Sequence, residues 1–302
     1  MRNTLLKSLY KFSPFDPAGD CLVPPACDGI KISCVINFYG RLDLLSGILF
    51  SLAEQDLSHD LFEVVLIEDR GGTDAGGNLA QEFGKTLPVR YSPLDKNYGF
   101  MGYSRNHGLA FSRGEYILFL DDDTVILQDN FLRILLNKFE ADPTIDGIIP
   151  KGQASFALLK DRYDYHDHYF MTNRCMAYRR TVLTELHGFM SDFVGQEDVE
   201  FSIRYTMTGK TSIETPELNY CHPPLLIDNL QKPMAVGMSF YGIKGRYPFL
   251  IWLLALANGS RHAPLLLLPS RKFQEMGKFG MGFMAGVLNA LLGKKKVQYQ
   301  SS

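Results

Sequence analysis

Alternating strand and helix patterns fill the first 125 residues of this chain and constrain its fold more than any other feature. Four segments are predicted as strands: 31–39, 62–69, 88–94 and 115–123. Three stretches between them are predicted as helices: 42–55, 75–85 and 104–114. Strands that are apolar on both faces and joined by helices predict a parallel sheet covered by helices on both sides. We therefore expect an α/β fold.

Polar residues follow three of these strands, at 37–39, 68–69 and 121–123. Ligands of such sheets bind beyond the carboxyl ends of the strands, so these residues can line one crevice. The last group is Asp121-Asp122-Asp123, and three adjacent carboxylates repel one another unless a cation or strong donors lie against them. The D-x-D form suits a hard divalent cation with positions left for phosphate oxygens.

Each feature has a simpler explanation when it is taken alone. Aspartate is common in turns after strands, so the three aspartates can be a solvated turn. Asp69 can be an ordinary turn or helix-capping residue before Gly-Gly-Thr-Asp. Glu197 and Asp198, near the start of another predicted helix, can simply favour its N-terminus by charge.

Four segments, in the same order, resemble glycosyltransferase family 2. They are CVINFYGR (34–41), EVVLIEDRGGTD (63–74), NYGFMGYSRNHGLAFSRGEYILFLDDD (97–123) and YRRTVLTELHGFMSDFVGQEDVEFSIR (178–204). The resemblance covers about residues 31–225. The chain departs from the family pattern at Asn37, where the family has proline, at Gly40, where it has asparagine, and by one extra residue after Asp69.

The resemblance implies a GT-A fold that binds a nucleotide-diphosphate sugar, with a UDP- or dTDP-sugar favoured. Asp69 would accept a hydrogen bond from N3–H of uracil or thymine, and Tyr39 would lie near the base. Arg105 would lie near the diphosphate, where a guanidinium makes paired hydrogen bonds to phosphate oxygens, and a surface helix salt bridge is the alternative. Arg41 and Asp122 complete the nucleotide-binding set that the resemblance implies.

The resemblance also implies a divalent cation, Mn²⁺ or Mg²⁺, which stabilises the leaving diphosphate. Asp121 and Asp123 would flank the cation, with Asp123 the direct ligand. His222 would complete the ligand set, with a half-buried loop histidine as the alternative. Asp198 would deprotonate the acceptor hydroxyl in an inverting, in-line displacement, and Glu197 would orient that hydroxyl. These two adjacent helical residues are expected to face in different directions.

Other functions and other sites were weighed. FLDDDTV also fits the motif of haloacid-dehalogenase-like phosphatases, with Asp121 as the nucleophile, but two strands precede it and no later G-D-x-x-x-D loop follows. A sugar-nucleotide pyrophosphorylase would need a G-x-G-T-R loop that the chain lacks. A non-catalytic sugar-nucleotide-binding module is a further alternative. His166 and His168, in the aromatic segment 163–170, are assigned no metal, and we expect that segment to stack on sugar rings.

The predicted organisation is an N-terminal extension (1–30), a catalytic domain (31–245) and a helical C-terminal region (246–302). The catalytic domain divides into a nucleotide-binding half (31–125) and an acceptor half (126–245). Apolar residues at 273–292 recur mostly at helical spacings of three and four, and Lys294-Lys295-Lys296 follow. This pattern fits a helix at an anionic membrane surface, with contact through 273–296, or a helix packed on the catalytic domain.

The charge and cysteine content of the chain limit the molecules that we expect it to bind and the compartment in which we expect it. The net charge is −2; residues 271–302 carry +5, so the rest carries −7, and no nucleic-acid partner is expected. Five scattered cysteines without a C-x-x-C pair indicate reduced thiols and an intracellular protein. We expect no secretory signal and no stretch of about 20 apolar residues. The expected location is the cytoplasm, with the inner face of the plasma membrane as one alternative, and the expected acceptor is a cell-surface glycan or a lipid-linked precursor.

Overall fold

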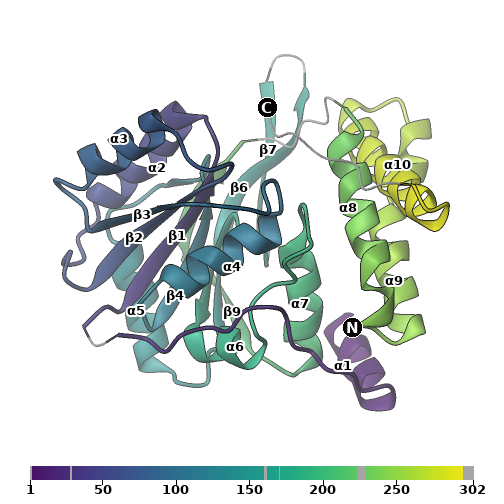
Figure 1. The fold of residues 1–302 in the computed structure, drawn as a ribbon, viewed down its shortest axis with the longest axis horizontal. Helices are drawn as coiled ribbons and strands as arrows, with labels where there is room; N and C mark the ends of the chain where they lie inside the picture. Colours follow the sequence, from purple (N-terminus) through teal and green to yellow (C-terminus); the bar gives the residue numbers. More distant parts are fainter. Residues whose placement is uncertain (1, 28, 160–161, 170, 224–228, 295–302) are drawn as a thin grey trace.

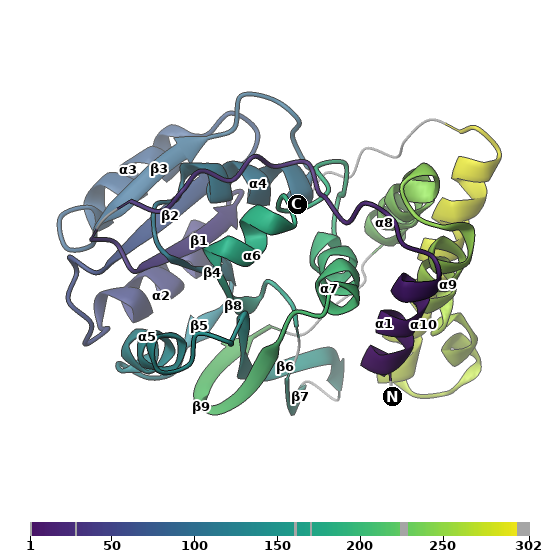
Figure 2. The same cartoon turned by 90° about the horizontal axis from the view of Figure 1, so that it is seen from below.

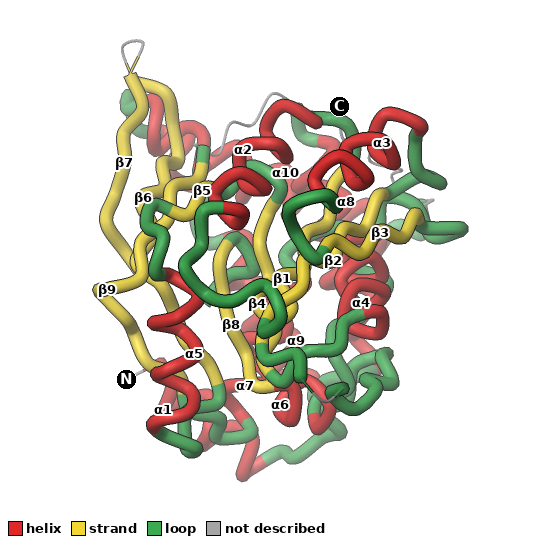
Figure 3. Tube along the Cα trace, turned by 90° about the vertical axis from the view of Figure 1, so that its left-hand side faces the viewer, coloured by secondary structure: helices red, strands yellow, loops and turns green. Residues whose placement is uncertain are grey.

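The computed structural model describes residues 2–27, 29–159, 162–169, 171–223 and 229–294. Within these residues one nine-stranded sheet runs in the order β3-β2-β1-β4-β8-β6-β9-β5, with β7 paired to β6. Helices lie on both faces of this sheet, and a group of C-terminal helices lies beside it (Figure 1). Figure 3 shows the twist of the sheet, with β3 near one edge and β7 and β9 near the other.

The first half of the sheet is parallel, as predicted. Its strands are β1 (Ile32–Phe38), β2 (Phe62–Glu68), β3 (Val89–Pro93) and β4 (Tyr116–Asp121). Its helices are α2 (Leu42–Ala53), α3 (Asp74–Phe83) and α4 (Met101–Phe111). Asn37 pairs in register with Asp121, and Phe38 pairs with Glu68, so the three polar strand ends lie at one edge.

The second half of the sheet mixes parallel and antiparallel pairs. Its strands are β5 (Val125–Ile126), β6 (Gly147–Leu159), β7 (Arg162–Tyr169), β8 (Cys175–Arg179) and β9 (Ser212–His222). Its helices are α5 (Phe131–Ala141), α6 (Arg180–Glu185) and α7 (Glu197–Met207). β8 is antiparallel to β4 and to β6, whereas β6 and β9 are parallel. α7 begins at Glu197, where the sequence predicted a helix.

Successive side chains along the central strands point to opposite faces of the sheet, and a separate hydrophobic core covers each face. Cys34 and Ile36 of β1 belong to the core under α2 and α5, while Val35 belongs to the opposite core with Leu109 of α4. All four side chains are fully buried. Strands that are apolar on both faces therefore fit a sheet with helices on both sides, as the sequence predicted.

A buried ion pair ties α7 to distant parts of the chain. The Arg204 guanidinium makes two hydrogen bonds to Glu200, of 2.7 and 2.8 Å. It also donates to the backbone carbonyls of Pro17, Leu186 and Gly188. Five acceptors satisfy a charge that would be strongly destabilising if it were buried alone. The N-terminal segment is thereby fixed against α7.

The C-terminal helices form one layer next to α7. They are α8 (Gln231–Gly242), the 3-10 helix η1 (Ile243–Gly245), α9 (Phe249–Ser260), the 3-10 helix η2 (Ala263–Leu267) and α10 (Arg271–Leu291). The N-terminal helix α1 (Arg2–Phe12) lies beside this layer, which has its own core around Phe240, Trp252 and Phe283 (Figure 2). The layer includes α8, which precedes the boundary expected at residue 246. Lys295 and Lys296 lie outside the described residues.

Candidate active site

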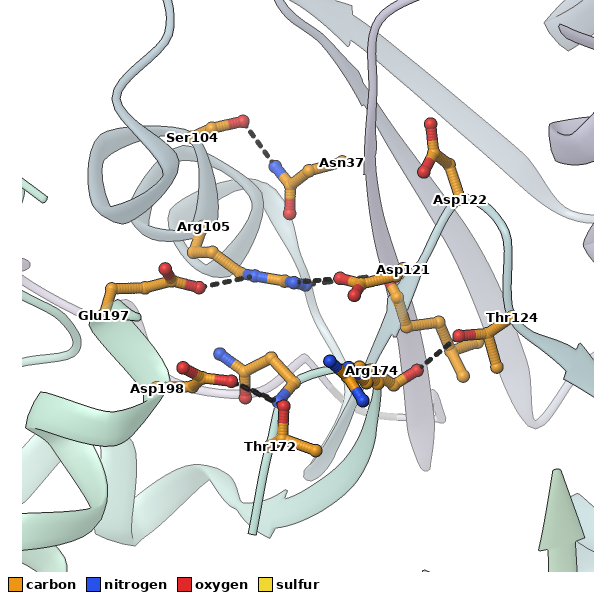
Figure 4. A network of polar contacts seen from close by, with 12 residues as sticks. Asn37, Ser104, Arg105, Asp121, Asp122, Thr124, Thr172, Arg174, Glu197 and Asp198 are labelled. Carbon is orange, nitrogen blue, oxygen red and sulfur yellow. Dashed lines mark hydrogen bonds and ion pairs between the residues drawn. The ribbon is translucent and has the colours of Figure 1, made fainter. Parts of the chain in front are cut away.

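The three adjacent aspartates face cationic side chains. Arg105, on α4, donates from Nη2 to Asp121 Oδ1 at 2.5 Å (Figure 4). Arg41, just before α2, pairs with Asp122 and donates from Nη1 to Asp123 Oδ2 at 2.9 Å. Two arginines from separate loops and helices therefore offset charges that would otherwise repel one another. Both arginines belong to the predicted nucleotide-binding set.

His222 completes the surroundings of the first and third aspartates. Its Nε2 lies 3.5 Å from Asp121 Oδ2 and 3.2 Å from Asp123 Oδ1. Its Nδ1 lies 2.7 Å from the Pro223 carbonyl oxygen. His222 is the last residue of β9 rather than part of a free loop, so strand pairing fixes its position. The structure thus brings together all three predicted metal ligands.

The acidity of these groups reflects their mutual contacts. Burial favours the neutral form of Asp121 and Asp123, but hydrogen bonds with His222 outweigh it and lower the pKa of both carboxyl groups. Burial lowers the pKa of His222, yet hydrogen bonds to Asp121 and Asp123 raise it overall to about 9. Asp122 differs: burial, aided by its two neighbours and opposed by Arg41, raises its pKa to about 7.

The ligand geometry fits a divalent cation. One oxygen from each of Asp121 and Asp123 and one nitrogen of His222 lie within 4.8 Å of one another. Asp123 Oδ1 is buried and faces the His222 Nε2 at 3.2 Å. Two carboxylate oxygens and one imidazole nitrogen are ligands that Mn²⁺ accepts, with room left for other oxygens. The site is therefore suited to the cation that the sequence predicted.

Arg105 lies in the interior of the protein, not on its surface. Its side chain is 3% exposed, so the alternative interpretation as a surface salt bridge is wrong. Besides Asp121, its Nε lies 3.3 Å from Glu197 Oε1 and its Nη1 donates to the Leu120 carbonyl. Burial, with the nearby charge of Asp198, raises the pKa of Glu197 to about 7. Arg105 therefore links Glu197 to Asp121, one of the predicted metal ligands.

Asp198 contacts different partners from its neighbour Glu197, which is bonded to Arg105. Its Oδ2 accepts hydrogen bonds from Thr172 Oγ1 at 2.6 Å and from the Asn173 backbone N–H at 3.1 Å (Figure 4). Its Oδ1 accepts from the Val199 backbone N–H at 2.8 Å. Three donors hold this carboxylate in one orientation on the first turn of α7. The loop before β8 supplies two of these donors.

The predicted base-recognition residues lie at the ends of β1 and β2. Asp69 accepts backbone N–H bonds from Arg70 and from Gly99, each at 2.8 Å. The Arg70 guanidinium lies over the Tyr39 ring at 4.4 Å. The cap of α3 is Thr73, whose side chain accepts from the Gly76 N–H, so the helix-capping alternative for Asp69 is wrong.

The sequence reasoning missed the loop that precedes β8. Arg174 accepts hydrogen bonds at its carbonyl oxygen from Thr124 Oγ1 and from the Asp121 N–H, and its charge contributes to lowering the pKa of Asp121. Thr172 and Asn173 hold Asp198. No motif marks this loop, and only its position next to a central strand can reveal its role. The side chains of the 163–170 segment, including His166 and His168, lie outside the described part, so their expected sugar contacts stay a prediction.

A cavity of about 960 Å³ begins beside this loop. Thr172, Arg174 and Gln196 line it, and Thr172 also holds Asp198, but Asp198 and the three metal ligands are not among the residues that line it. Farther away its walls come from α1, α7, β9 and the C-terminal helices. Its remaining polar lining includes Lys7, Ser202, Thr206, Lys210, Thr211, Ser212, Glu214, Asn258, Arg261 and His262. A polar ligand of several sugar rings has room here, on the far side of Thr172 from the Asp198 carboxylate contact.

A parallel half-sheet with a D-x-D pair at its edge, a histidine returning to it and a separate carboxylate beside a cavity define a GT-A glycosyltransferase. The chain belongs to glycosyl transferase family 2, whose sequence profile matches residues 33–193. This match confirms the family predicted from the sequence. It runs through Asp121–Asp123, so the phosphatase alternative is not favoured.

Curated relatives match a limited part of the chain. The Staphylococcus aureus poly(ribitol-phosphate) beta-N-acetylglucosaminyltransferase TarS is 33% identical over 97 residues, or 32% of this chain and 17% of TarS. The Bacillus spizizenii poly(ribitol-phosphate) beta-glucosyltransferase is 33% identical over 105 residues, or 34% of this chain and 16% of that enzyme. The matched region thus spans about a sixth of each relative's length.

Solved structures share the fold over most of the chain. The mannosyltransferase PcManGT from Pyrobaculum calidifontis, in complex with GDP-Man and Mn²⁺, covers 97% of both chains with a TM-score of 0.60 and 15% identity. S. aureus TarS 1–349 in complex with UDP-GlcNAc has a TM-score of 0.63 and 18% identity, covering 85% of this chain and 82% of that one. The GT-A fold with C-terminal helices is confirmed.

Proposed function

We propose that this protein transfers a sugar from a UDP- or dTDP-sugar to a hydroxyl group of a cell-surface glycan or its precursor. The observation that carries the proposal is the convergence of Asp121, Asp123 and His222 at one edge of the sheet, with the Asp198 carboxylate held by Thr172 and Asn173 of the loop before β8. The TarS structure with UDP-GlcNAc and the PcManGT structure with GDP-Man and Mn²⁺ support a nucleotide-sugar donor and a divalent cation.

The donor half of the site positions the diphosphate. A divalent cation bound by Asp121, Asp123 and His222 would neutralise charge on the leaving nucleoside diphosphate. Arg105 holds Asp121 in place from the interior, and Glu197 holds Arg105. We assign Glu197 this positioning role because its side chain is 4% exposed and is bonded to Arg105.

Asp198 is the proposed base. The bonds from Thr172, Asn173 and Val199 fix its carboxylate, and the cavity gives an acceptor access to this side of α7. The base accepts the acceptor's proton as the hydroxyl oxygen forms its bond to the anomeric carbon and the bond to the diphosphate breaks. A single base and one displacement give inversion at that carbon.

The cavity indicates the chemistry of the acceptor. Its lining carries Lys7, Arg174 and Arg261, together with Lys210, which pairs with Glu185, against one carboxylate of its own, Glu214. The hydroxyl groups of its serines and threonines suit a polyol or sugar, and the excess of basic side chains suits phosphate groups. The two poly(ribitol-phosphate) glycosyltransferases among the relatives act on a polymer of this kind. We therefore propose a hydroxylated acceptor that carries phosphate.

Asp198→Asn tests the proposal. The amide keeps the size of the side chain but cannot take the proton, so turnover should fall by roughly 10²–10⁴-fold while UDP-sugar binding in Mn²⁺ is retained. A panel of nucleotide sugars, screened first for metal-dependent hydrolysis, identifies the donor to use. The matched control is Asp60→Asn. Asp60 is exposed and lies just before β2, at the end of that strand opposite the site.

Three outcomes would each contradict one part of the proposal. Near-normal turnover in Asp198→Asn would place the base elsewhere. An α-linked product from an α-linked donor, read by NMR, would refute inversion. If no UDP- or dTDP-sugar binds while another nucleotide sugar does, the proposed donor is wrong. The roles assigned to Asp69 and Tyr39 in recognising the base would then be wrong as well.

A further inference from the structure

Large exposed apolar side chains are concentrated in the C-terminal helices. Twelve of the twenty-one such side chains in the described residues fall between residues 249 and 292. They are Phe249, Leu250, Leu253, Leu254, Leu267, Leu268, Phe273, Met281, Met284, Leu288, Leu291 and Leu292. Single exposed apolar residues are ordinary on soluble proteins, but a group of this size on adjacent elements indicates an interaction surface.

Helix α10 shows the arrangement most clearly. Phe283 and Gly286 face inward: Phe283 is fully buried, and a Cβ at Gly286 would lie 2.0 Å from the Met234 carbonyl oxygen of α8. Leu288 and Leu291 face outward and are 53% and 63% exposed. The helix is therefore packed on the protein along its glycines and still presents leucines to the outside. The packed helix, one of the two alternatives drawn from the sequence, is therefore what the structure shows, and contact with a membrane stays a prediction.

The charge of this region complements an anionic surface. Residues 244–302 contain nine Lys/Arg and one Glu, a net charge of +8, so the remaining chain carries −10. The basic residues flank the apolar helices: Lys244 and Arg246 precede α9, Arg261 follows it, Arg271 and Lys272 begin α10, and Lys294 follows α10. Apolar helices flanked by basic side chains are typical of proteins that lie at anionic lipid surfaces.

The helices are suited to lying on a bilayer rather than crossing it. By length and hydropathy alone, one segment of 19 residues, Phe249–Leu267, is able to span a membrane, with 28% of it buried, which the sequence reasoning did not anticipate. The continuous α-helix in this segment has only 12 residues, about 18 Å, against roughly 30 Å of hydrocarbon. A turn with Arg261 and the 3-10 helix η2 complete the segment.

We propose that α9, η2 and α10 form a docking surface for a bilayer that contains anionic lipid. Figures 1 and 2 place these helices in one layer on the side of the molecule away from β3. Asn258 of α9, His262 before η2 and Phe279 of α10 also line the 960 Å³ cavity, so docking holds the cavity beside the membrane. The inference concerns where the protein acts and does not depend on the identity of the donor.

Vesicle co-sedimentation of the full chain tests this surface. The protein should sediment with vesicles that contain phosphatidylglycerol, bind vesicles of phosphatidylcholine alone less strongly, and lose the difference at high salt. Leu288→Ser combined with Leu291→Ser removes two half-exposed leucines and should lower the partition coefficient by about tenfold or more. The matched control combines Leu22→Ser with Leu127→Ser, which are 85% and 48% exposed on other parts of the chain.

Two further measurements keep the result unambiguous. Thermal unfolding of both double variants should match the parent, since all four side chains are exposed, and UDP-sugar binding in solution should be unchanged. Absence of sedimentation with anionic vesicles, or equal loss in the control variant, overturns the proposal. A stable dimer that dissociates in the Leu288/Leu291 variant and binds no vesicles would instead identify a second copy as the occupant, and overturns it equally.

Discussion

Metal binding at this site should depend on pH through His222. The imidazole lies between two carboxylates whose hydrogen bonds raise its pKa to about 9, so near neutral pH it carries a proton. A histidine binds a metal ion only in its neutral, deprotonated form, and the cation therefore has to displace that proton. Because the pKa is raised to about 9, His222 stays protonated throughout the acidic and neutral range, and the proton competes most effectively with the metal ion at low pH. Metal affinity should increase as the pH rises toward the pKa of His222.

The magnitude follows from the same value. Below a pKa of about 9 the neutral fraction of His222 grows about tenfold with each pH unit, so it rises roughly 30-fold from about pH 6.5 to about pH 8. Mn²⁺ affinity should rise by the same factor. His222→Gln keeps a polar side chain of similar size but cannot titrate. The logarithm of its Mn²⁺ affinity should therefore rise with pH less steeply than that of the parent, and the two slopes should differ by about one logarithmic unit per pH unit.

Calorimetric titration with Mn²⁺ in the presence of UDP measures both slopes. Asp122 and Glu197, whose pKa values are each raised to about 7, contribute to the slope in the parent and in the variant alike. The difference between the two proteins therefore isolates His222. Repeating the titration in buffers of different ionisation enthalpy counts the protons released. Equal slopes in the parent and in His222→Gln would refute the assignment of His222 as a ligand.

Two other variants test the metal site and the helical layer. Asp123→Asn should abolish Mn²⁺-dependent UDP binding while the protein stays folded; unchanged affinity by calorimetry would remove Asp123 from the ligand set. Gly286→Ala should lower the free energy of unfolding by about 2 kcal/mol, because the new Cβ meets the Met234 carbonyl at 2.0 Å. Gly242→Ala, where a Cβ meets nothing within 4 Å, should be neutral or slightly stabilising in the same denaturant titration.

Local sequence patterns predicted the parts of the structure that depend on local physics. The apolar run before Asp121 gave β4, and the adjacent carboxylates pointed to a cation because like charges need compensation. The cations that compensate them were harder to foresee, since Arg41 and Asp123 are 82 positions apart and meet only through the sheet. Arg174 belongs to a loop without any motif. Its role depends on β8 returning beside β4.

The second half of the sheet was less predictable for a related reason. Parallel strands buried on both faces produce continuous apolar runs, whereas β9 is half-buried and polar along much of its length. A half-buried loop histidine was the alternative for His222, yet the residue ends strand β9 and pairs in register with Ala154 of β6. Long-range strand pairing, which no short window of sequence contains, decides its position.

Helix α7 has a mechanical consequence for the proposed reaction. Asp198 lies on its first turn, and Glu200 binds both Arg204 and the Tyr247 hydroxyl of the C-terminal layer. Arg204 in turn holds the N-terminal segment at Pro17. These contacts fix α7 relative to the C-terminal helices, so the helix connects the proposed base rigidly to that layer. Whatever fixes the orientation of the layer also fixes the direction from which an acceptor hydroxyl reaches Asp198, and no hinge is needed to align them.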